Sequence, residues 1–125
     1  MTVRRKRATP RRRTAPRWST EDWAAANLIL YGRSNGCCEH CGRPLNGRAE
    51  RHHRMRRRDG GDRLSNLLLL LPECHNWVTE HPTEAKANGW IVEVGIADPA
   101  DVPVRLGLSG ALWLLDDQGG RHVVA

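Results

Sequence analysis

The chain has 125 residues, a length that allows one compact domain with tails and excludes a multidomain enzyme. Only 39% of the residues are apolar and Phe is absent, so the hydrophobic core must be small. The 20 Lys and Arg outnumber the 14 Asp and Glu, and the resulting net charge of +6 favours a polyanionic partner such as nucleic acid. The longest apolar run, residues 67–71, is far shorter than the roughly 20 residues that span a bilayer. With no secretory signal either, we expect a cytoplasmic protein with no membrane partner.

Residues 1–17 form a strongly basic segment with eight Lys and Arg, no acid and two prolines. Such a composition cannot bury enough surface to fold alone, and it predicts a disordered tail ahead of a single domain at 18–125. Two interpretations stay open. The tail either contacts nucleic-acid phosphates, which would relieve its charge repulsion, or serves solubility alone.

A helix is predicted over residues 18–34. Ser19 or Thr20 can cap it, and Glu21 and Asp22 suit the positive end of its dipole. Trp23, Ala26 and Leu30 then share one face, which indicates packing against a core.

Residues 38–41 read Cys-Glu-His-Cys and predict a zinc knuckle, because a tight turn can present two thiolates to one ion. Cys74 supplies a third thiol, but the position that would complete a second Cys-x2-Cys is Leu71. Disulfides are the alternative, although a reducing compartment favours metal. The fourth position could be filled by Cys37, His40 or a water, or the site could survive as a metal-free cluster of packed thiols.

Toward the C-terminus the pattern predicts a short helix after Pro72, a break at Pro82 and an end at Gly89. Residues 90–94 are then predicted as a strand, and the apolar residues of 102–108, 111–115 and 122–124 complete a small β-meander. Asp116 and Asp117 are interpreted as turn residues, and no chemistry is expected in this extension.

The most specific signal is an ordered series of polar residues: Glu50-x-His52-His53, Gly60-Gly61-Asp62, Asn66 and Cys74-His75, downstream of the Cys-x2-Cys pair. This series resembles the HNH endonuclease family, and short phage-encoded HNH proteins in particular. The resemblance covers about residues 37–82. It implies an α+β fold with a ββα-metal core at 37–89, an N-terminal helix and a β-rich extension at 90–125.

The resemblance also implies roles for individual residues. His53 would be the general base, with Asn66 and His75 as the other catalytic residues; Asn66 would orient the base or bind the ion. His52 and His75 would hold one divalent ion, with Mg²⁺ preferred to Mn²⁺, Ni²⁺ or Zn²⁺. Glu50 fits the family's acidic position, although a salt bridge to nearby arginines explains it almost as well. His81 lies about 240° around the helix from His75 and is interpreted as a non-ligand.

Four arginines follow the expected base directly and predict a clamp for DNA phosphates: Arg54, Arg56, Arg57 and Arg58. Phosphate contacts carry no sequence information, so we expect low sequence specificity. The charge is also divided, because residues 1–67 carry +11 and residues 68–125 carry −5. The DNA is therefore expected on the side of the first half.

The sequence thus predicts a metal-dependent DNA endonuclease that is monomeric and acts in the bacterial cytoplasm. The resemblance implies a phage type, with phage DNA-packaging proteins as candidate partners. A non-catalytic, zinc-stabilised DNA-binding module is the main alternative, and a ribonuclease of the same fold is the third.

Overall fold

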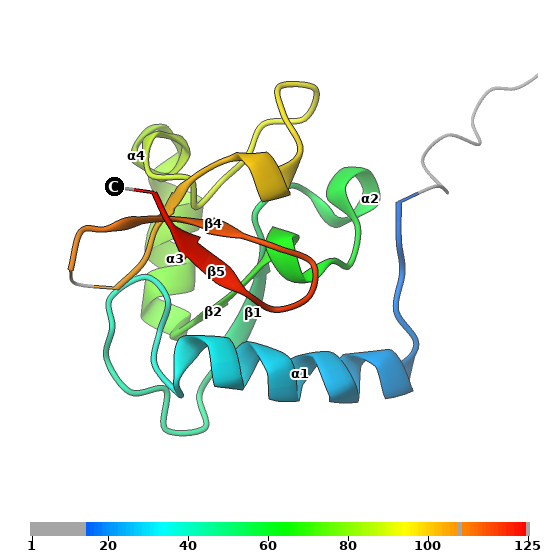
Figure 1. The fold of residues 1–125 in the computed structure, drawn as a ribbon. Helices are drawn as coiled ribbons and strands as arrows, with labels where there is room; N and C mark the ends of the chain where they lie inside the picture. Colours follow the sequence, from blue (N-terminus) through cyan, green and yellow to red (C-terminus); the bar gives the residue numbers. More distant parts are fainter. Residues whose placement is uncertain (1–14, 108, 125) are drawn as a thin grey trace, which may run out of the picture.

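The computed structural model describes residues 15–107 and 109–124 (Figure 1). The predicted tail at 1–17 therefore lies mostly outside the described residues. The chain contains four α-helices, two 3-10 helices and five strands in the described part: α1 (Thr20–Ser34), β1 (Glu50–His53), α2 (Arg57–Gly60), η2 (Leu64–Asn66), β2 (Leu67–Leu70), α3 (Pro72–Glu80), α4 (Pro82–Ala87), η3 (Pro99–Asp101), β3 (Val104–Arg105), β4 (Leu112–Leu115) and β5 (Arg121–Val123). No helix among these residues is both long and apolar enough to cross a membrane.

The predicted N-terminal helix is present as α1. The Ser19 side chain accepts a hydrogen bond from the Asp22 amide, and the Asp22 carboxylate accepts one from the Ser19 amide, which completes a capping box. Asn35 ends the helix in the left-handed conformation. Ala26 and Leu30 are buried in the core, so α1 is held mainly by packing.

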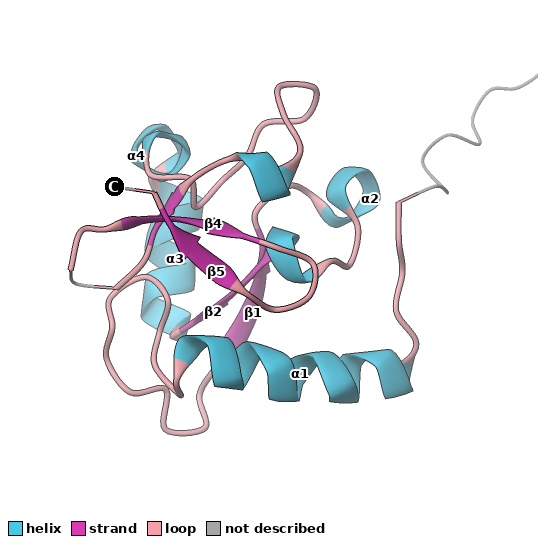
Figure 2. Ribbon diagram, in the orientation of Figure 1, coloured by secondary structure: helices cyan, strands magenta, loops and turns pink. Residues whose placement is uncertain are grey.

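The predicted ββα core is also present. Strands β1 and β2 pair antiparallel, with His52 opposite Leu68 and His53 opposite Leu67. All four residues of β2 are buried, since α1 packs against this strand while α3 packs against β1 (Figure 2). Pro72 starts α3 at a position where its missing N–H is harmless, and Pro82 starts α4 in the same way. The structure is thus a mixed α+β fold, as the sequence predicts.

A buried ion pair joins the knuckle to this core. The Arg33 guanidinium donates to both carboxylate oxygens of Glu39 at 2.8 and 2.9 Å, and both side chains are at most 2% exposed. Arg33 also donates to the carbonyl of Leu67, and Glu39 accepts from the amide of Leu69. The guanidinium of Arg33 and the carboxylate of Glu39 are therefore both hydrogen-bonded beyond the pair itself, which is the condition for burying an ion pair.

The C-terminal extension contains the predicted meander, with strand order β3-β4-β5. The predicted strand at 90–94 is wrong. The amides of Trp90 and Ile91 both donate to the Ala85 carbonyl of α4, and the Val92 amide donates to the Arg54 carbonyl in a loop. Among the described residues no strand pairs with this segment. The segment has strand composition, but it joins neither the β1-β2 nor the β3-β4-β5 sheet.

Candidate functional site

Two histidines from different elements lie side by side, His52 at the end of β1 and His75 in α3. Their ring centroids are 5.1 Å apart with the planes at 66°. Two imidazoles that ligate one ion tetrahedrally, with nitrogens about 2.0 Å from it, place their centroids about 5 Å apart. The observed separation therefore fits a shared ion.

Each of these rings has one nitrogen held by an oxygen acceptor. His52 Nε2 lies 2.7 Å from the carbonyl of Trp90, and because a carbonyl can only accept, Nε2 carries the proton and Nδ1 keeps its lone pair. His75 Nδ1 lies 2.8 Å from Glu50 Oε1, which leaves Nε2 for a ligand. Metal-binding histidines are commonly oriented by such outer acceptors. Glu50 thus pairs with His75, and the proposed salt bridge from Glu50 to the neighbouring arginines is not formed.

Burial keeps the His52 ring neutral. It lowers the pKa of His52 to about 4, and the hydrogen bond to the Trp90 carbonyl only partly opposes this effect. The nearby His75, His53 and Arg54 lower it further. Metal binding needs neutral imidazole, so His52 is ready to ligate near pH 7. Among the described residues no further Cys, His or carboxylate ligand atom joins the pair to make a group of three within 4.8 Å. An ion there would keep positions open for water or phosphate.

His53, the last residue of β1, has a different partner. Its Nε2 lies 2.9 Å from Asp62 Oδ1, and Trp23 of α1 lies edge-on to the ring. The side chain is 22% exposed, so water can reach it. Neighbouring strand residues point to opposite faces, which explains why His52 and His53 make separate contacts. The two rings still interact, because the charge of His53 contributes to the lowered pKa of His52.

Asn66 is fully buried and holds the loop between the two strands. Its amide oxygen accepts from the Met55 amide at 2.7 Å, and its amide nitrogen donates to the carbonyls of Met55 and Gly61 at 2.9 and 3.0 Å. The side chain contacts neither the His53 ring nor the His52–His75 pair through these bonds. Any influence on His53 would therefore pass through the loop that carries Asp62.

The three predicted zinc ligands come together. The thiols of Cys38, Cys41 and Cys74 all lie within 4.8 Å of one another, and the cysteines of the chain are free. Arg43 donates to Cys41 Sγ at 3.2 Å, and its hydrogen bonds lower the pKa of Cys41 despite the opposing effect of burial. Burial, with the adjacent thiols, raises the pKa of Cys74 to about 12. Three convergent thiols are a donor set that suits zinc.

A comparison with protein-family models matches residues 38–80 to the HNH endonuclease family. Residues 38–80 form an HNH domain. The matched segment begins at Cys38, ends with α3, and contains the expected H, N and H residues His53, Asn66 and His75. No curated protein and no solved structure matches the chain. An HNH domain indicates a nuclease or nucleic-acid-binding function, a divalent metal and DNA as partner.

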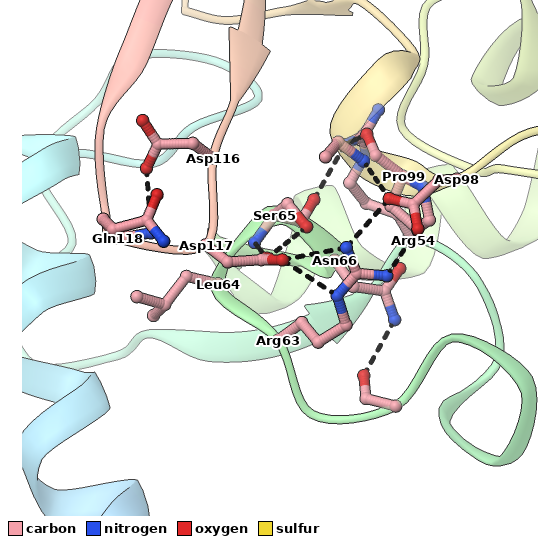
Figure 3. Close-up of polar contacts among 12 residues, drawn as sticks. Arg54, Arg63, Leu64, Ser65, Asn66, Asp98, Pro99, Asp116, Asp117 and Gln118 are labelled. Carbon is pink, nitrogen blue, oxygen red and sulfur yellow. Dashed lines mark hydrogen bonds and ion pairs between the residues drawn. The ribbon is translucent and has the colours of Figure 1, made fainter. Parts of the chain in front are cut away.

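One of the four predicted phosphate contacts is wrong, since the Arg54 side chain is 2% exposed and lies between the HNH domain and the segments that follow it (Figure 3). Its guanidinium donates four hydrogen bonds of 2.8–3.0 Å to backbone carbonyls: Gly89, Ser65, Pro99 and Val102. A run of arginines in the sequence does not reveal which member turns inward. The other three remain accessible, with side chains 71%, 44% and 56% exposed for Arg56, Arg57 and Arg58.

The C-terminal extension is tied to the HNH domain by charged residues that the sequence analysis missed. Asp117, interpreted as a turn residue, accepts from the Ser65 hydroxyl and from Arg63 (Figure 3). Arg63 also binds Asp98 with two hydrogen bonds. These contacts fix the segment just before Asn66. Asp98 and Asp117 lie 35 and 54 residues from Arg63 in the chain, so only the fold reveals these contacts.

The remaining candidates lie outside both clusters. The thiol of Cys37 contacts the carbonyl of Asn35, and His40 packs between Trp77 and Trp90. Neither belongs to the group of three thiols. His81 stacks on Trp77 with centroids 4.2 Å apart and binds its carbonyl, so its ring covers the end of α3.

Proposed function

We propose that the protein is a metal-dependent endonuclease that hydrolyses phosphodiester bonds of DNA with low sequence specificity. The observation that carries the proposal is the pairing of His52 with His75, each with one nitrogen fixed by an oxygen acceptor, beside the independently held His53. Outer acceptors of this kind commonly orient histidines that bind a metal ion.

In this mechanism His52 Nδ1 and His75 Nε2 would hold the ion, and a bound ion would supply positive charge to neutralise the negative charge growing on the phosphate and the leaving oxygen. His53 takes the proton from the attacking water, since a neutral imidazole is a competent base near pH 7. Arg56 and Arg58 bind phosphates of the DNA backbone, and Arg54 makes no contact with the DNA.

The chemistry of the ligands bears on which ion is used. Imidazole nitrogens suit Zn²⁺ and Ni²⁺, whereas Mg²⁺ prefers carboxylate oxygens and water. We therefore propose a transition-metal ion ahead of the Mg²⁺ that the sequence analysis prefers. A monomeric state and a cytoplasmic location stay predictions, and a link with phage DNA packaging stays a prediction from the resemblance.

The test is plasmid nicking with Mg²⁺, Mn²⁺, Ni²⁺ or Zn²⁺ and with EDTA, for the wild type, His53→Ala and His75→Ala. His122→Ala is the matched control, because His122 is an exposed histidine paired only with Asp116. We expect metal-dependent nicking by the wild type and the control, and a loss of about 10²–10⁴-fold in His53→Ala. His75→Ala should also lose bound catalytic ion.

Three results would contradict the proposal. Full metal-dependent cleavage by folded His53→Ala would remove the assigned base. Tight, salt-sensitive DNA binding without cleavage in any ion would favour the non-catalytic module, and digestion of RNA but not plasmid would favour the ribonuclease.

A further inference from the structure

Asp62 ends the Gly-Gly-Asp motif, and the proposed mechanism gives it no role. It is fully buried, and both of its oxygens are occupied. Oδ1 accepts from His53 Nε2 and from Arg57 Nε, each at 2.9 Å. Oδ2 accepts from Arg57 Nη2 at 2.9 Å and from the Trp18 amide at 2.8 Å. A buried carboxylate with four donors is held in one orientation.

The carboxylate is ionised across the working range of pH. Burial alone would raise the pKa of Asp62, but the hydrogen bonds from Arg57, Trp18 and His53 outweigh burial and lower it. An ionised carboxylate can only accept hydrogen bonds. The neutral His53 ring must therefore carry its proton on Nε2 and keep its lone pair on Nδ1.

The backbone around Asp62 adds to this rigidity. Its amide donates to the Pro16 carbonyl at 2.6 Å. Gly61 adopts φ +76°, and a Cβ there would come within 2.8 Å of three Pro16 atoms, so only glycine allows this close approach. The segment at Pro16–Trp18 thus packs directly on the loop, which places the start of the folded domain before Trp18.

We propose that Asp62 is the positioning residue of the general base: it fixes the Nε2–H tautomer of His53, so that Nδ1 takes the proton from water. The inference rests on the proposed function, because it deepens the role of His53. After the transfer, the imidazolium remains hydrogen-bonded to the carboxylate, and the proton on Nδ1 leaves to solvent when the ring is regenerated.

A simple salt bridge with Arg57 would not explain the geometry. Arg57 already binds both oxygens of Asp62 from the exposed side. His53 donates to the same Oδ1 from β1, and the Trp18 amide donates to Oδ2. Each donor thus uses its own lone pair of the carboxylate. An arrangement of this kind orients imidazoles in catalytic triads.

The first measurement uses the wild-type chain alone. Long-range ¹H–¹⁵N spectra at about pH 8, well above the ordinary imidazole pKa of about 6.5, report which ring nitrogen of His53 is protonated. We expect the Nε2–H tautomer. The Nδ1–H tautomer, or an equal mixture of both, would overturn the inference without any variant.

The second measurement compares Asp62→Asn with Asp117→Asn, which removes an arginine-paired carboxylate that does not contact His53. In Asp62→Asn the amide nitrogen can turn toward His53 and select the Nδ1–H tautomer. We expect kcat for nicking to fall by at least about 10²-fold, toward the roughly 10⁴-fold seen for the equivalent change in a triad, with KM for DNA not raised. Asp117→Asn should keep wild-type kcat and tautomer.

The outcomes separate the two proposals. A wild type that cleaves with none of the four ions refutes the proposed function. A cleaving wild type whose Asp62→Asn variant keeps its kcat and its Nε2–H tautomer refutes the role of Asp62 and leaves the proposed function intact.

Discussion

Replacing Arg54 should damage folding and leave the intrinsic DNA contacts of the domain unchanged. The side chain is 2% exposed and donates to four carbonyls from three segments of the chain. Burial lowers its pKa to about 10, so the group still carries its charge at pH 7. Arg54→Ala would remove a guanidinium donor from each of these carbonyls, although that of Pro99 also accepts from the Val102 amide. A hydrogen bond to a charged group contributes about 1.5–3 kcal/mol, offset by the cost of burying the cation, so we expect a net loss of about 3–5 kcal/mol.

That loss is a large fraction of the roughly 5–15 kcal/mol that stabilises a domain. With an m-value of about 2 kcal/mol per M for a small protein, the urea midpoint should fall by about 2 M in zinc-containing buffer. Arg54→Lys should lose about half as much, because an ammonium group offers three donors without the planar fork. Arg58→Ala is the control, with a side chain 56% exposed: we expect a stability change within about 0.5 kcal/mol and weaker DNA binding. An Arg54→Ala variant with a wild-type urea midpoint and reduced DNA affinity would refute the reasoning and restore Arg54 to the phosphate clamp.

Three further tests concern other parts of the molecule. Deleting residues 1–14 removes seven basic residues, and it should weaken DNA binding and flatten the dependence of affinity on salt in anisotropy titrations. An unchanged slope would leave that segment with a solubility role. Cys74→Ser should lower the zinc content and the melting temperature, because it removes one of the three thiols. Leu71→Cys should bind zinc more tightly in competition with a chelator, because the amide of residue 71 already lies 3.3 Å from Cys38 Sγ. Equal zinc affinity in Leu71→Cys would count against a knuckle that lacks one ligand. Hydrogen bonds from Ser65 and Arg63 outweigh burial and lower the pKa of Asp117 below its ordinary 3.8. The stabilisation is therefore present above about pH 4 and is lost as pH falls through the folded-state pKa. Between pH 5 and 2 the free energy of unfolding should fall less steeply in Asp117→Asn than in the wild type, and an equal fall would contradict the ion pair.

Local sequence signals predicted the elements that depend on local chemistry. Ser19 and Asp22 mark the start of α1, and the prolines at 72 and 82 mark the starts of α3 and α4. The strand predicted at 90–94 failed because a strand requires a partner edge, and its pairing cannot be inferred from β-propensity alone.

The sequence by itself determined which chemical groups are present and in what order: three cysteines for zinc, a His-His pair, a downstream histidine, and the +11 charge of residues 1–67. The tertiary structure alone decided how those groups are used. It turned Arg54 inward, joined Glu50 to His75, and gave His53 a fully buried carboxylate in Asp62. The physical reason is that donor and acceptor partners lie far apart in the chain. The orientation of a guanidinium or an imidazole depends on which carbonyls and carboxylates the fold brings within about 3 Å.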